Sequence, residues 1–187
     1  MHLSHSYLVA GFGLLLMAVL SPIGFLTALP NGSLTLAGVI ALLVGLLDIA
    51  VAVALFYVTR SGGKNLALSS AILRIIYAIA LLGAGVYLLI ARDADSFNYI
   101  WDRALLLFGI HLFLMAASFY RSAELPTWVG VLLFIAGVGY VADALAVWFG
   151  FTPGFEISTV SFFGEVVLIV WLLWKGVRMR RSVVPRQ

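Results

Sequence analysis

Residues 34–59 read LTLAGVIALLVGLLDIAVAVALFYVT, and the only charged side chain in this run is Asp48. A helix of about 20 apolar residues crosses the ~30 Å hydrocarbon core of a bilayer, so this segment is long enough to span a membrane. The whole chain of 187 residues has the same character, with 64% hydrophobic and 10% charged residues and a mean hydropathy of +1.14. A soluble domain carries about 25% charged residues. The sequence therefore predicts an integral membrane protein.

Five further apolar segments are long enough to cross a bilayer. Almost nothing remains for a separate soluble domain, so the sequence predicts an all-α bundle of six transmembrane helices in one membrane domain, residues 1–176, followed by a basic tail, residues 177–187. Pro22 and Gly24 predict a kink in the first span, which lacks the basic start of a signal peptide and is expected to be retained. The predicted spans are residues 7–29, 34–59, 65–90, 104–120, 128–149 and 157–176.

The distribution of basic residues predicts the orientation of the bundle. With the N-terminus inside, only Arg92 and Arg103 lie in outer loops, and this bias places both termini in the cytoplasm. The net charge of +3 therefore indicates contact with membrane lipids, not with nucleic acid. We expect a multi-pass protein of the bacterial inner (plasma) membrane. The basic residues on the predicted inner side are Arg60, Lys64, Arg121, Lys175, Arg178, Arg180, Arg181 and Arg186.

Four ionisable side chains, Asp48, Arg74, His111 and Glu165, lie inside four different predicted spans. Each is 10 to 12 residues from a basic residue at one end of its own span. At a rise of 1.5 Å per residue this distance is roughly 15 to 18 Å, about half of the hydrocarbon core. We therefore expect the four groups to meet near the bilayer midplane. Charges at that depth are costly and usually mark a functional or a paired site.

Helical spacing indicates which neighbours these groups have. Asp48 shares a face with small residues that allow two helices to approach closely, so it is expected to face another helix and not lipid. Four further polar residues are predicted to support the site, although for Asp143 a purely structural role is favoured: Tyr77, Tyr140, Asp143 and Ser161. The small residues on the Asp48 face are Gly38, Ala41, Gly45 and Ala52.

Charge balance suggests what the site does. With His111 neutral, the four groups carry one positive and two negative charges, so one proton on His111 or Glu165 would neutralise them. We expect Glu165 to be protonated, or to share a proton with His111. The leading hypothesis is a protein that binds or moves a small ligand or a proton, with Arg74 holding an anion and Glu165 or His111 titrating.

Two other classes of function stay open at this point. One is an intramembrane enzyme that acts on a lipophilic substrate, with Glu165 as general acid and His111 as its partner. The other is a structural or sensing subunit, in which buried ion pairs only fix the arrangement of the helices. Whether the protein is an enzyme, which ligand it takes and how it oligomerises do not follow from the sequence.

Cofactor and metal chemistry finds little support in the chain. The absence of cysteine excludes disulfides, iron–sulfur clusters and thiolate metal sites. A metal site built from Asp48, His111 and Glu165 is disfavoured because Arg74 at the same depth would repel the ion. The chain contains no glycine-rich phosphate loop, nucleophile elbow or HExxH motif. We therefore predict no cofactor, no metal and no identifiable catalytic residue.

Several of these segments also resemble a known family from about Gly45 to Gly176. The chain is similar to a bacterial family of multi-pass membrane proteins catalogued as domain of unknown function 4386, although that family would be expected to have a basic residue at Thr127. The resemblance implies a polytopic membrane protein and no activity. It rests on Asp48-Ile-Ala-Val-Ala-Val-Ala-Leu-Phe-Tyr, Arg74-Ile-Ile-Tyr77-Ala, Gly109-Ile-His111, Leu125-Pro126, Gly-Val-Leu-Leu-Phe-Ile-Ala-Gly-Val-Gly-Tyr140-Val-Ala-Asp143, Gly164-Glu165 and Trp171-Leu-Leu-Trp-Lys-Gly176.

Overall fold

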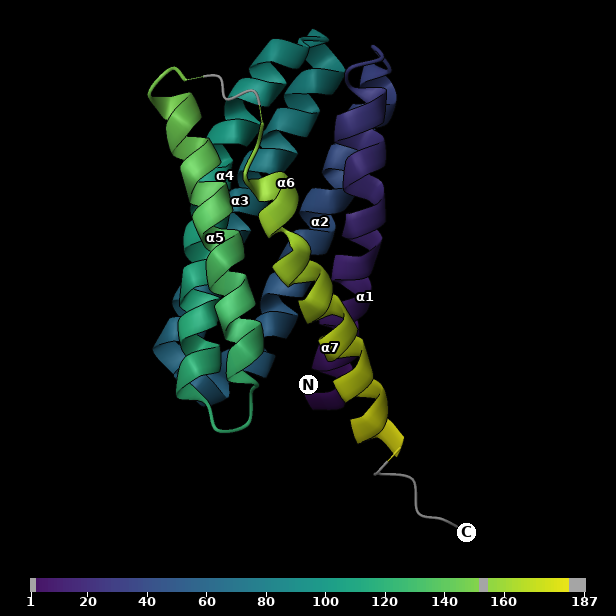
Figure 1. Ribbon diagram of the computed structural model, residues 1–187. Helices are drawn as coiled ribbons and strands as arrows, with labels where there is room; N and C mark the ends of the chain where they lie inside the picture. Colours follow the sequence, from purple (N-terminus) through teal and green to yellow (C-terminus); the bar gives the residue numbers. More distant parts are fainter. Residues whose placement is uncertain (1–2, 152–154, 182–187) are drawn as a thin grey trace.

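The computed structural model describes residues 3–151 and 155–181, and this part of the chain is helical, with no strand (Figure 1). It contains six helical segments that are long and apolar enough to cross a membrane, which confirms the predicted all-α bundle. Three of the six segments are not continuous α-helices, because each joins two helical elements. The elements are α1 (Leu3–Ser21), η1 (Pro22–Ala28), α2 (Leu34–Thr59), η2 (Arg60–Gly62), α3 (Lys64–Ala91), α4 (Ala94–Arg121), α5 (Thr127–Trp148), α6 (Ser158–Ser161) and α7 (Phe163–Arg181).

The predicted irregularity in the first span is a π-helix, η1, which continues α1. Pro22 has no backbone N–H and cannot form the hydrogen bond of a regular α-helix at this position. The wider turn is visible where the Leu29 N–H donates to the Gly24 carbonyl over 2.9 Å, five residues back. Gly24 also allows η1 to lie close to Ile40 of α2, because a Cβ atom there would be 2.6 Å from the Ile40 side chain.

Helix α4 begins ten residues earlier than the predicted fourth span, because residues 94–103 are helical instead of a polar loop. Asp93 caps the helix by accepting hydrogen bonds from the backbone N–H groups of Asp95 and Ser96. The Ser96 hydroxyl, which also donates to this carboxylate, and these N–H groups hold the pKa of Asp93 below its ordinary value. The buried Phe97 ring packs 5.6 Å from Phe25. The polar residues of this segment made it look like a loop in the sequence, although it forms the amphipathic start of α4.

The sixth span is interrupted near its start and extends further than predicted at its end. The short helix α6 stops at Ser161, and α7 begins at Phe163. Helix α7 then continues to Arg181, so residues 177–181 belong to the last helix and not to a separate tail. The remainder of the predicted basic tail, residues 182–187, lies outside the described residues.

The helices alternate in direction, so α1 begins and α7 ends at the same end of the bundle (Figure 1). Basic residues gather at that end, including Arg60, Lys64, Arg121 and Lys175. The cytoplasmic assignment of this end stays a prediction from the charge bias. Large apolar side chains on the outer surface, such as Leu46, Ile79 and Phe134, are exposed and fit contact with lipid.

Close helix packing brings α2 next to α3. A Cβ atom on Gly45 would lie 2.7 Å from Leu82, and one on Gly85 would lie 3.0 Å from Ala41. The absence of these side chains lets the two backbones approach each other. As the stripe of small residues predicted, Asp48 faces another helix, and this neighbour is α3.

Candidate functional site

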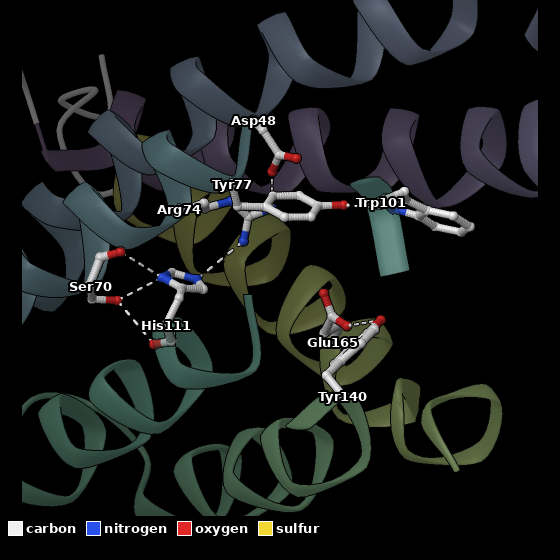
Figure 2. A network of polar contacts seen from close by, with 8 residues as sticks. All are labelled: Asp48, Ser70, Arg74, Tyr77, Trp101, His111, Tyr140 and Glu165. Atoms are coloured by element: carbon white, nitrogen blue, oxygen red, sulfur yellow. Dashed lines mark hydrogen bonds and ion pairs between the residues drawn. The ribbon is translucent and has the colours of Figure 1, made fainter. Parts of the chain in front are cut away.

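Asp48 of α2 and Arg74 of α3 form an ion pair in the interior of the bundle (Figure 2). Arg74 Nη2 lies 2.5 Å from Asp48 Oδ1, and both side chains are at most 3% exposed. The pairing agrees with the matched depths in the sequence. Asp48 Oδ1 and Arg74 Nε are buried and have no hydrogen bond of good geometry among the described residues.

His111 of α4 extends this pair into a chain of polar contacts (Figure 2). Arg74 Nη1 lies 3.2 Å from His111 Nε2, and His111 Nδ1 lies 2.8 Å from both the hydroxyl and the backbone carbonyl oxygen of Ser70. Because an arginine can only donate, Nε2 must accept, and the ring proton must be on Nδ1 and point to Ser70. A second proton on Nε2 would set two cations against each other. This geometry therefore holds His111 neutral.

Glu165 of α7 belongs to a different contact. Its Oε1 accepts a hydrogen bond of 2.8 Å from the hydroxyl of Tyr140 in α5, and its second carboxylate oxygen has no hydrogen bond among the described residues. Figure 2 shows this pair apart from the Asp48, Arg74 and His111 chain. The expected sharing of a proton between Glu165 and His111 has no direct contact to support it.

Phe108 of α4 lies between the two groups. The Arg74 guanidinium is 5.0 Å from the centre of the Phe108 ring, and the Tyr140 ring packs on the same phenylalanine edge-on, with centroids 5.0 Å apart. A cation at this distance is attracted by the ring face. Phe108 lies three residues before His111, a spacing that does not indicate this role in the sequence, because apolar residues at helical spacing are common in any core.

The supporting residues named from the sequence have separate structural roles. Tyr77 accepts a hydrogen bond of 3.2 Å from the Trp101 indole, a partner that sequence reasoning missed because Trp101 looked like an interfacial aromatic. Asp143 accepts hydrogen bonds from the backbone N–H groups of Ile157 and Ser158, at 3.0 and 2.7 Å. It therefore fixes the entry into α6. Ser161 makes a long contact of 3.5 Å with the Ala136 carbonyl.

A cavity of about 190 Å³ connects the two groups. Asp48, Arg74, Tyr77, Tyr140 and Glu165 contribute its polar wall, and His111 does not line it. Apolar and aromatic side chains from α1, η1, α2, α4 and α7 form the rest. Pockets that hold drug-sized ligands have volumes of about 300 to 1,000 Å³. This cavity is smaller than that range.

The metal hypothesis finds no geometric support in residues 3–151 and 155–181. No group of three or more histidine, aspartate and glutamate side chains comes together there in an arrangement that could hold an ion. Of the three candidates, Asp48 contacts Arg74, His111 contacts Ser70 and Arg74, and Glu165 contacts Tyr140.

The fold and the buried polar residues define a multi-pass integral membrane protein. The sequence profile of the family described as domain of unknown function, DUF4386, matches residues 7–176. The chain belongs to this family. An uncharacterised protein of Archaeoglobus fulgidus is 38% identical over 141 residues, which cover 75% of this chain and 84% of that protein. No solved structure matches the chain.

These comparisons agree with the predicted family and with the predicted membrane class, and they give no activity. The matched residues include all four of the ionisable groups in the spans. The relative named above is archaeal, so family membership does not by itself place this chain in a bacterial inner membrane. The six apolar helices indicate a multi-pass protein of a membrane.

Proposed function

We propose that the protein binds a small ligand in the central cavity and that Glu165 is the group that engages the ligand's polar end. The free carboxylate oxygen of Glu165 carries this proposal. Glu165 is half-buried and lines the cavity, and a carboxylate oxygen there that has no protein hydrogen bond is available to a ligand.

Tyr140 positions the Glu165 carboxyl group. Its hydroxyl donates to Oε1 over 2.8 Å, and its ring is held against Phe108, so the carboxyl group has a fixed orientation before a ligand arrives. A preorganised group loses less conformational entropy on binding than a mobile one. Glu165 thus resembles a binding group more than a residue that holds helices together.

The Asp48, Arg74 and His111 chain supports the site from the opposite wall. Arg74 already contacts Asp48, His111 and the Phe108 ring, so its charge is largely compensated and anion binding is not its main role. The intramembrane enzyme is less well supported than binding. That hypothesis makes His111 the partner of the general acid Glu165, and His111 is directed to Ser70 and Arg74 instead.

The proposal is tested with hexan-1-ol, a small uncharged probe with one polar end. The reporter is Trp101, which lines the cavity, in a protein whose other four tryptophans are replaced by phenylalanine and which is held in lipid nanodiscs. We expect a saturable change in Trp101 emission. Glu165→Leu removes the polar partner and should weaken binding about three- to tenfold, the equivalent of one hydrogen bond.

A pair of substitutions separates cavity binding from partition into lipid. Ala18 lines the cavity and is exposed, so Ala18→Phe adds volume there without filling a closed core. Ala50 of α2 is also exposed and lies outside the cavity lining, so Ala50→Phe is its matched control. Saturation should disappear in the first variant and persist in the second. An equal response in both variants, or none in the unblocked reporter protein, would overturn the proposal.

A further inference from the structure

We propose that the ligand of the central cavity is a small organic cation, such as a primary amine with a short apolar chain, and that it reaches the cavity through an acidic pocket next to Leu105. This inference rests on the proposed function and specifies its ligand class. It draws on the charges of the cavity wall, its aromatic lining and the neighbouring pocket.

The charges on the cavity wall favour a positive ligand. Asp48 and Arg74 compensate each other through their ion pair, which leaves Glu165 as the carboxyl group without a basic partner. An ammonium group beside it would complete a charge-assisted hydrogen bond in a site of low dielectric constant. An anionic ligand would instead place two negative groups together. Arg74 is already paired with Asp48.

The aromatic lining is also suited to a cation. Ring faces attract an ammonium group, most strongly where water is excluded. The Arg74 guanidinium already uses one such face, that of Phe108. An alkyl chain on the ligand would contact the apolar remainder of the wall, which includes Leu14, Met17 and Ile169. The rings that line the cavity are Phe25, Tyr77, Trp101, Phe108, Tyr140 and Phe162.

A second pocket, of about 310 Å³, lies next to the cavity and shares Leu105 with it. Asp102, Asp143 and Glu156 contribute three carboxyl groups to its lining. Asp143 already accepts two backbone hydrogen bonds, so Asp102 and Glu156 remain available to attract a cation. The adjacent Arg103 does not line the pocket and instead lies over the Tyr99 ring, 3.5 Å from its centre.

This arrangement gives a cation a route from the acidic pocket to Glu165 in the central cavity. The pocket lies at the end of the bundle where α4 begins and α5 ends, away from the basic end. A negative vestibule raises the local concentration of positive ligands and speeds their association at low salt. Leu105 lines both spaces, so a cation would pass this side chain on its way from the vestibule to Glu165.

The ligand class is tested by comparing hexylamine, protonated near neutral pH, with hexan-1-ol through the Trp101 signal. We expect hexylamine to bind at least about tenfold more tightly than hexan-1-ol, a ratio that corresponds to 1.4 kcal/mol. Glu165→Gln should remove this preference and leave binding of the alcohol in place. Hexanoate, with the same chain length and a negative charge, is expected to bind more weakly than either.

The outcomes separate this inference from the proposed function. If hexan-1-ol binds and hexylamine binds no more tightly, the cation class is overturned and the cavity proposal stands. A preference that survives in Glu165→Gln also overturns it, because the cation would then be held elsewhere. If neither probe gives a saturable signal that Ala18→Phe removes, the proposed function itself fails.

Entry through the acidic pocket is tested by measuring association rates. Asp102→Asn combined with Glu156→Gln changes two residues outside the central cavity and should slow the association of hexylamine about tenfold at low salt. The association rate of hexan-1-ol should stay the same, and added salt should slow hexylamine only in the protein that keeps both acids. Equal association rates of hexylamine with and without the two acids would overturn the acidic path.

Discussion

The polar side chains in the middle of the bundle form two groups that use their hydrogen-bonding capacity differently. In the Asp48, Arg74 and His111 group, charges and ring nitrogens are directed at one another and at Ser70, across α2, α3 and α4. In the Glu165 and Tyr140 group, one contact is made and one carboxylate oxygen is left at a cavity wall. Similar depth in the membrane therefore does not imply a similar role.

The two groups should differ in how much stability the fold loses when one of their members is removed. A buried ion pair is strongly destabilised when one partner is lost, because the other charge then remains without compensation. A carboxyl group that lines a cavity can be neutral or can meet a ligand, so its loss need not affect the fold. The following substitutions test this contrast, starting from the largest expected effect on stability.

Loss of one partner of the ion pair should have the largest effect. We expect Asp48→Asn and Arg74→Gln each to lower the free energy of unfolding by about 3 kcal/mol, because each leaves a buried charge. The double variant should lose much less than the sum of the two. A double-mutant cycle of unfolding in detergent measures this coupling. Strictly additive losses would contradict the assignment of the pair as a structural unit.

His111→Phe should have the next largest effect. The ring shape is approximately kept, while Arg74 Nη1 and the Ser70 carbonyl lose the contacts that His111 provides. Unsatisfied buried groups cost about 1 to 3 kcal/mol, and we expect a loss of about 2 kcal/mol in the same unfolding assay. Phe113→Leu on the same helix changes a side chain outside both polar groups and serves as a comparison. If His111→Phe were no less stable than the parent, His111 would not belong to the structural group.

Gly164→Ala should disturb the second group through its backbone. A Cβ atom at this position would collide with the backbone carbonyl of Leu132 in α5, so α7 must move away from the helix that carries Tyr140. We expect a loss of about 1 to 2 kcal/mol and weaker ligand binding. Gly83→Ala is the matched control, because nothing lies within 4 Å of its added Cβ. Equal effects of the two alanines would show that helix propensity alone explains the result.

Glu165→Gln should have the smallest effect on folding, within about 0.5 kcal/mol, because glutamine keeps the shape and can still accept from Tyr140. Its effect on ligand binding should be large by comparison. Unfolding and hexylamine binding measured on the same preparation check both parts. A loss of stability as large as that of the Asp48 variant would place Glu165 in the structural group and remove the contrast.

Most of the fold could be predicted because a membrane imposes a simple length rule on apolar helices. The length rule did not predict the start of α4, because polar residues there made a helical segment look like a loop. The first turns of α4 contain Asp95, Asn98 and Asp102, yet the segment is helical because Asp93 caps it and Phe97 is buried. The break between α6 and α7 also had no clear signal, since Ser158 to Phe163 contains neither proline nor glycine.

The candidate site was predictable in part. Depth alone selected Asp48, Arg74, His111 and Glu165, and the small residues near Asp48 indicated that it faces another helix. Depth could not show that Arg74 and His111 are in contact while Glu165 is not, because it does not determine how helices are arranged around the bundle. The same limit concealed Trp101 as the partner of Tyr77.

The sequence by itself determined that this chain is a six-helix membrane protein with ionisable groups at one depth. Composition and the energetic cost of charges in hydrocarbon are sufficient for that conclusion. Only the tertiary structure decided which of those groups compensate one another and which one lines the cavity without a charged partner. Pairing depends on the rotation and lateral order of the helices, which are set by side-chain packing between segments far apart in the chain.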